Sequence, residues 1–118
     1  MCVDAKGDVR VPRAEQIAVL NDRLRQTGQG GKLMVTRGVH ALPGLSPEAL
    51  LAALRAYSAF DVDNDPHGER DLGDIEVFGA SLLWKIDYYD QAMEFASPDP
   101  ADPAVTRRVL TVMLFEEY

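Results

Sequence analysis

The chain has 118 residues and a mass of 13.0 kDa, with 47% hydrophobic and 26% charged residues. These values are typical of one globular domain with a single core and exclude a disordered chain. The net charge of −7 disfavours docking on a phosphate backbone, and the only cysteine, Cys2, excludes an intrachain disulfide and a cysteine-based zinc site.

Residues 1–11 are predicted to be a flexible N-terminal tail of a single domain that spans residues 1–118. The start of the chain has no apolar core of signal-peptide length, and no stretch approaches the ~18 apolar residues of a membrane span. A lone cysteine suits a reducing compartment. We therefore expect a cytoplasmic protein that makes no contact with a membrane.

A first helix is predicted to begin near Pro12, a residue that suits a first turn. Its buried side shows helical spacing at Ile17, Leu20 and Leu24. Gly28 supplies the left-handed position that ends many helices, and "KLMVTRGV" from Lys32 then reads as a short strand.

A second helix is predicted after Ser46, which is a good N-cap, with Pro47 at the first helical position. Its buried stripe consists of Leu50, Ala53, Leu54 and Tyr57.

The stretch "DIEVFGASLLWKIDYY" predicts a hairpin with a two-residue turn at Gly79-Ala80. Strict alternation gives its second strand two faces. One face carries Leu82, Trp84, Ile86 and Tyr88, and the other carries Leu83, Lys85, Asp87 and Tyr89. "AMEFAS", residues 92–97, is interpreted as a further short strand.

The C-terminal segment is predicted to be a helix capped by Asp102, with Pro103 at its first position. Its inward residues would be Val105, Val109, Leu110, Val112 and Met113, and its outward residues Arg107, Arg108 and Thr111. The order of elements, with strands clustered late, predicts an α+β fold. We expect a small antiparallel sheet of three to four strands with about three helices packed on one face.

The motif "TGQGGK", residues 27–32, invites comparison with a phosphate-binding loop. That loop needs a strand before it and a helix after it, so that the helix N-terminus faces the phosphates. Here the order is helix, loop, strand, and a helix stop followed by a tight turn explains the glycines better.

Charge is distributed unevenly along the chain. Residues 61–102 hold twelve acids and only two basic residues, Arg70 and Lys85, which gives a local charge of −10. Such a segment suits a protein partner with a basic surface and disfavours direct binding to nucleic acid. The partner-binding candidates are Asp61, Asp63, Asp65, Glu69, Asp71 and Asp74, with Tyr89 as an aromatic anchor.

The densest acidic stretch, "DVDNDPHGERDLGD" at residues 61–74, permits three interpretations. Its Asn, Asp, Pro and Gly residues are those of turns that satisfy their own backbone groups. A divalent cation is the second interpretation, with oxygen and imidazole ligands from Asp63, Asp65, His67 and Asp74. Acid/base catalysis is the third, with His67 oriented by Asp65, Glu69 or Asp71.

The chain resembles a bacterial family catalogued as domain of unknown function number 3768. The resemblance rests on "LNDRLRQTGQGGKLMVTRGV" at 20–39, "DNDPHGERDLGDIEV" at 63–77 and "WKIDYYDQAMEFASPDPADPAVTRRVLTVMLFEEY" at 84–118. It implies a proteobacterial protein that is often carried on plasmids, and it implies no activity and no catalytic residues.

We expect a non-enzymatic binding protein of mobile genetic elements that needs no cofactor. Its acidic surface would engage a basic nucleic-acid-binding protein and so inhibit a host defence system, by an anti-CRISPR or anti-restriction action. The alternative is a small divalent-metal-dependent enzyme or metal-binding module centred on Asp63–Asp74. A third hypothesis is an accessory protein in conjugation or plasmid upkeep.

Overall fold

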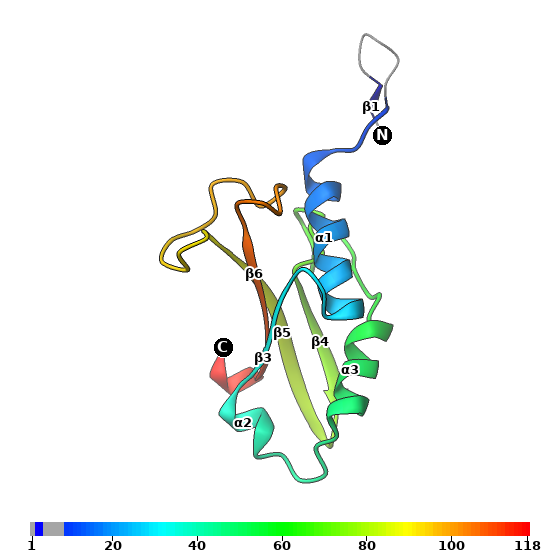
Figure 1. Ribbon diagram of the computed structural model, residues 1–118. Coiled ribbons are helices and arrows are strands. Elements are labelled where there is room, and N and C mark those ends of the chain that lie inside the picture. Colours follow the sequence, from blue (N-terminus) through cyan, green and yellow to red (C-terminus); the bar gives the residue numbers. More distant parts are fainter. Residues whose placement is uncertain (1, 4–8) are drawn as a thin grey trace.

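The structure is a computed structural model that describes residues 2–3 and 9–118 (Figure 1). The elements in chain order are β1 (Cys2–Val3), β2 (Val9–Arg10), α1 (Arg13–Thr27), β3 (Gly31–Val35), α2 (Arg37–His40), α3 (Pro47–Ala56), β4 (Leu72–Val77), β5 (Ala80–Tyr89), β6 (Arg107–Leu114) and the 3-10 helix η1 (Phe115–Glu117). Within the predicted N-terminal tail, β1 pairs antiparallel with β2, while residues 1 and 4–8 lie outside the described residues.

The first two predicted helices are confirmed. α1 follows Pro12 and ends at Gly28, whose φ of 75° lets its N–H reach the Leu24 carbonyl at 2.8 Å. α3 begins with Pro47 after Ser46, whose hydroxyl accepts a hydrogen bond from the Ala49 N–H at 3.3 Å. The local capping signals were sufficient for both because each acts within a few residues of the helix end.

The predicted strand from Lys32 is shorter than expected. β3 ends at Val35, and the Thr36 side chain then caps the short helix α2 by accepting from the Val39 N–H at 3.5 Å. Val39 is fully buried, so the sequence "RGVH" contributes to the core from a helical turn instead of from a strand.

The hairpin β4–β5 is confirmed, but its turn lies one residue earlier than predicted. Val77 pairs with Ala80, so the two turn residues are Phe78 and Gly79. Both have positive φ, 57° and 70°, which is the pattern of a type I′ turn. The predicted strand at residues 92–97 is wrong, since only an isolated bridge joins Tyr89 to Ala96.

The predicted C-terminal helix is also wrong, because residues 107–114 form the strand β6. The Asp102 carboxylate accepts from the Ala104 N–H at 2.9 Å and so closes a turn, not a helix. β6 lies between β3 and β5, and a central strand with both faces shielded reads as a nearly continuous apolar run. Such a run resembles the inward face of a helix when periodicity alone is considered.

The strand order of the main sheet is β3-β6-β5-β4. β5 is antiparallel to both of its neighbours, β4 and β6, whereas β3 runs parallel to β6 with Leu33 opposite Leu110. The fold is therefore α+β as predicted, and the sheet is mixed instead of wholly antiparallel.

The core lies between α1, α3 and one face of the sheet (Figure 1). The predicted face of β5 is confirmed, with Leu82 and Trp84 fully buried and Ile86 only 4% exposed. Tyr57 and Phe60 meet the Trp84 ring edge to face, with ring centroids 5.4 and 6.1 Å away. Val39 from α2 joins the same core, so all three α-helices contribute to this face.

Candidate protein-binding surface

The acidic loop, defined as residues 57–71, connects α3 to β4 and packs beside α1. Asn21 of α1 donates to the Glu69 carbonyl at 3.0 Å. Arg70 donates to Asp22 at 2.9 Å and to Glu15 at 3.2 Å, so both carboxylates of α1 hold the same guanidinium. The one basic residue of this loop is therefore committed to α1 and leaves the carboxylates of the loop unneutralised.

Most polar groups at the tip of the loop are used to build turns. The Asp61 carboxylate accepts from the Asp63 and Asn64 N–H groups at 2.9 and 3.0 Å. Asn64 in return accepts from the Asp61 N–H at 3.0 Å, and the Asp65 carboxylate accepts from the Arg70 N–H at 3.1 Å. These side chains accept hydrogen bonds from backbone N–H groups of the loop, as the turn interpretation expects.

Three carboxylates of the loop lie close enough to repel one another. Asp65, Glu69 and Asp71 are half-buried, whereas Asp61 and Asp63 beside them are exposed. Burial raises the pKa of the Asp71 carboxyl, and the charges of Glu69 and Asp65 raise it further. We call these five residues the acidic cluster. Its internal repulsion would be relieved by a positively charged partner.

The predicted set of binding residues is divided between two faces of the sheet. Asp74 lies opposite Leu83 on the face that points away from α1 and α3, and Tyr89 is on that same face of β5. Asp74 is exposed and Tyr89 is half-buried. The acidic cluster, in contrast, lies on the α1 side, so the structure does not bring Asp74 and Tyr89 into one surface with the loop.

The predicted metal ligands are not grouped in the described part of the chain, and no hydrogen bond there joins His67 to Asp65 or Glu69. Among residues 2–3 and 9–118, no three His, Cys, Asp or Glu side chains are grouped as metal ligands. His67 is exposed, and the Asp65 carboxylate is engaged by the Arg70 N–H instead of by an imidazole. Glu69 accepts from the Tyr88 hydroxyl at 2.9 Å.

A buried polar network behind the acidic cluster was missed by sequence reasoning. Asn21, fully buried, donates to the Tyr88 hydroxyl at 2.8 Å and accepts from the Arg108 Nε at 3.0 Å. Arg108 is 2% exposed, lies over the Tyr88 ring and also donates to the Pro100 carbonyl. Burial raises the pKa of the Tyr88 hydroxyl far above its usual range, so this phenol is a hydrogen-bond donor to Glu69 and not a base.

A second buried cation anchors α1 to α3. Arg25 is 3% exposed and donates to the Leu54 and Tyr57 carbonyls at 2.7 and 2.9 Å and to Asp22 at 3.0 Å. Asn21 and Arg25 stand at helical spacing inside the apolar stripe of α1. Polar residues at inward positions of an amphipathic helix could have predicted both the network around Asn21 and the buried Arg25.

The other face of the sheet carries a mixture of charged and apolar side chains. On β5, Lys85 Nζ lies 2.9 Å from the Asp87 carboxylate and forms an ion pair with it. Hydrogen bonding to Asp87 raises the pKa of Lys85. Met34 on β3 is 52% exposed, in contrast to the nearly buried Leu83 and Met113 in the middle of this face.

Together these features define a small α+β protein whose mixed sheet is covered by helices on one face and flanked by an acidic loop. The family described as "Protein of unknown function (DUF3768)" matches residues 35–117, and the chain belongs to that family. Of the three resembling pieces, 63–77 and all but the last residue of 84–118 fall within the match. No curated protein and no solved structure matches the chain. Within the described residues, no helix is both long and apolar enough to cross a membrane.

Proposed function

We propose that this protein is a non-enzymatic binding protein that engages a partner with a basic surface through the acidic cluster. The observation that carries the proposal is the half-buried Asp71 carboxyl, whose pKa is raised by burial and further by the charges of Glu69 and Asp65, while the Arg70 guanidinium is paired with Glu15 and Asp22 instead. A Lys- or Arg-rich partner would supply the missing opposite charge, speed the encounter and fix its register.

Hydrogen bonds from the protein interior fix part of the acidic cluster before any partner binds. Glu69 is held by Tyr88, and Tyr88 is held by Asn21 and Arg108 from two further elements. Carboxylates that are fixed before binding lose little conformational entropy in a complex. We therefore infer that Glu69, which Tyr88 holds in place, and the exposed Asp63 both contact the partner.

We further propose that the partner is a nucleic-acid-binding protein of a host defence system, and that the protein serves mobile genetic elements by occupying that basic surface. An acidic protein surface can occupy a groove that is shaped for phosphates because both present dense negative charge. The bacterial, plasmid-borne setting implied by the family resemblance supports this part of the proposal.

The test is a plasmid-transformation assay in hosts with an active CRISPR or restriction system, with and without the expressed protein. The variant Asp63→Lys/Asp71→Asn makes the acidic cluster more positive by three charges. The matched control, Glu94→Lys/Asp74→Asn, makes the same change of net charge away from the cluster. We expect the cluster variant to lose protection and the control to keep it.

Two results would end the proposal: full protection by the cluster variant with a melting temperature at or above that of the wild type, or no protection by the wild-type protein in any defence background. Loss of protection by the control alone would move the interface to the other sheet face. His67→Ala is expected to have no effect, and its inactivation of the protein would favour chemistry at His67. Any purified complex should weaken steeply with salt, since exposed charges are screened over ~8 Å at physiological ionic strength.

A further inference from the structure

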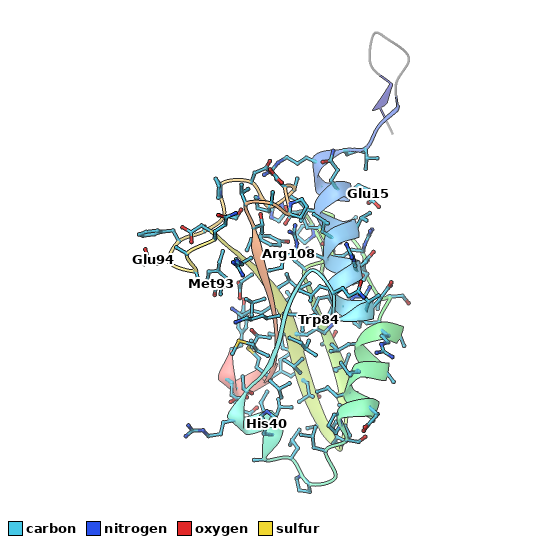
Figure 2. All side chains as sticks on the ribbon, in the orientation of Figure 1. Glu15, His40, Trp84, Met93, Glu94 and Arg108 are labelled. Atoms are coloured by element: carbon cyan, nitrogen blue, oxygen red, sulfur yellow. The ribbon has the colours of Figure 1, made fainter. Side chains whose placement is uncertain are left out.

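A cleft of about 560 Å³ lies at the other edge of the sheet, between the start of β3, the start of β6 and the 90–106 loop. Its floor includes Val109, and its outer wall is formed by Gln91 and Met93. Figure 2 shows Met93 on the side of β6 that points away from α1. Neither the acidic loop nor the helices line this cleft.

The sheet register explains why two cationic side chains meet there. Lys32 lies opposite Val109 in the parallel pair, and Arg107 precedes Val109 by two residues on the same face. Arg108 turns to the opposite face, where Asn21 and Pro100 accept from its guanidinium. Lys32 and Arg107 are thus the ionisable side chains directed to the open side of this cleft.

The glycines of "TGQGGK" allow the two strands to approach closely at the same point. A Cβ atom on Gly31 would lie 2.5 Å from the Arg108 carbonyl oxygen, so only glycine fits against β6 there. Gly30 has a φ of 88° and no heavy atom within 4 Å of an added Cβ, which leaves its backbone beside open space. The close approach of the strands therefore explains Gly31, and both glycines leave peptide groups exposed at the edge of the cleft.

The electrostatics of the cleft contrast with those of the whole chain, whose net charge is −7. Lys32 and Arg107 are exposed and form no ion pair within the described residues. Nearby acids have other partners: Asp87, opposite Val109, lies 2.9 Å from Lys85 Nζ, while Asp90 accepts from the Glu94 N–H at 3.1 Å and Asp102 from the Ala104 N–H at 2.9 Å. Two unpaired cations that converge on one cavity favour an anion between them.

We propose that this cleft binds a small phosphate-bearing molecule with a compact apolar body. Lys32 would supply a point charge and Arg107 a planar fork that matches a phosphate group, while Met93, Pro103 and Val109 would contact the apolar part. The volume is within the range of about 300–1,000 Å³ that is usual for small-molecule sites. This differs from a phosphate-binding loop, since side chains of two parallel strands and not a helix N-terminus would hold the anion.

Hydrogen bonds hold the 90–106 loop in place where it bounds the cleft. Gln91 donates to the Ala104 carbonyl and so ties its two ends together across the cleft. The Ser97 N–H donates to the Tyr88 carbonyl at 3.0 Å, and the Ser97 hydroxyl lies 2.7 Å from that of Thr106. A ligand would therefore meet a formed cavity, which reduces the entropic cost of binding.

The experiment is a titration of the full-length, ¹⁵N-labelled protein at low salt, followed by amide chemical shifts. The probes are phenyl phosphate, inorganic phosphate, benzoate and benzyl alcohol. We expect saturable shifts at Gly30, Gly31, Lys32 and residues 106–109, with a Kd of roughly 1 mM for phenyl phosphate, as suits so small a ligand. Inorganic phosphate should bind more weakly at the same amides, and benzyl alcohol should not saturate.

The double variant Lys32→Gln/Arg107→Gln should weaken phenyl phosphate binding by about tenfold or more, because it removes both charge-assisted contacts. Arg37→Gln/Arg55→Gln removes two exposed cations elsewhere and should leave the Kd unchanged. Absence of saturation, or equal weakening in both variants, would overturn the proposal. Benzoate binding as tight as phenyl phosphate would overturn the phosphate assignment. These outcomes do not depend on the acidic cluster, so they are separate from the transformation assay.

Discussion

Replacing Trp84 with Ala is expected to lower the free energy of unfolding by about 3–5 kcal/mol, the range for a large aromatic in a packed core. The side chain is fully buried on β5 and touches Tyr57 and Phe60 edge to face. A tryptophan buries up to ~250 Å², which at ~25 cal/mol per Å² is roughly 6 kcal/mol of transfer free energy as an upper bound.

Two further effects act in opposite directions. Each edge-to-face aromatic pair adds about 0.5–1.5 kcal/mol beyond its buried area, and both pairs of Trp84 would be lost. The Trp84 Nε1 is buried without a hydrogen-bond partner among the described residues, and its removal returns about 1–3 kcal/mol. These effects approximately cancel, and the upper-bound nature of the transfer value places the net loss near the middle of the range.

The measurement is urea unfolding followed by far-UV circular dichroism, since the variant has lost the only tryptophan of the chain. Trp84→Phe serves as a milder variant that keeps most of the ring packing if Trp84→Ala does not fold. In the wild-type protein, Trp84 fluorescence should be blue-shifted and resistant to aqueous quenchers. An emission maximum typical of hydrated indole, or a loss below ~1 kcal/mol in Trp84→Ala, would refute the burial of this ring.

Three further changes test other parts of the fold. Gly73→Ala should cost about 1–3 kcal/mol in urea unfolding by overpacking, because the new Cβ would lie 2.6 Å from the Trp84 Nε1; a neutral result would contradict the close strand approach. Asp71→Asn should raise the unfolding midpoint at neutral pH. The folded-state pKa of Asp71 lies above its ordinary value of 3.8, so the folded protein favours the protonated carboxyl. The stability that Asp71 contributes is therefore fully present below pH 3.8 and is lost as the pH rises through the raised pKa. The difference between variant and wild type should therefore shrink in acid, and a constant difference would exclude the linkage. Glu117→Gln should speed hydrogen exchange at the Gly38 and Leu114 N–H groups, which donate to this carboxylate. The hydrogen bond from the Thr36 hydroxyl, together with those from the two N–H groups, lowers the pKa of Glu117 below 4.5, so the wild-type protection is present above pH 4.5 and is lost in acid. Unchanged exchange at both N–H groups would contradict their hydrogen bonds to Glu117.

Local signals in the sequence determined the elements whose ends are set by neighbouring residues. Pro12 and Gly28 bound α1, and Ser46 with Pro47 starts α3, because caps and left-handed glycines act within one turn of the helix. The alternation around Trp84 likewise identified the buried face of β5, since side chains on a strand alternate regardless of what covers them. The acidic character of residues 61–102 is also a property of the sequence alone.

Only the tertiary structure decided the fate of residues 107–114, the division of the acids and the two buried arginines. β6 is a strand because β3 and β5 pair with it on both sides, and long-range pairing outweighs a periodicity that a helix could also show. Asp65, Glu69 and Asp71 become a like-charge group because the loop folds back on α1, whereas Asp74 is carried to the other sheet face by its place on β4. Lys32 and Arg107 are 75 positions apart in the sequence, and they share a cleft because of the parallel register of β3 and β6. The free energy of ionising or burying a side chain depends on the groups that surround it in space, and those groups come from distant parts of the chain.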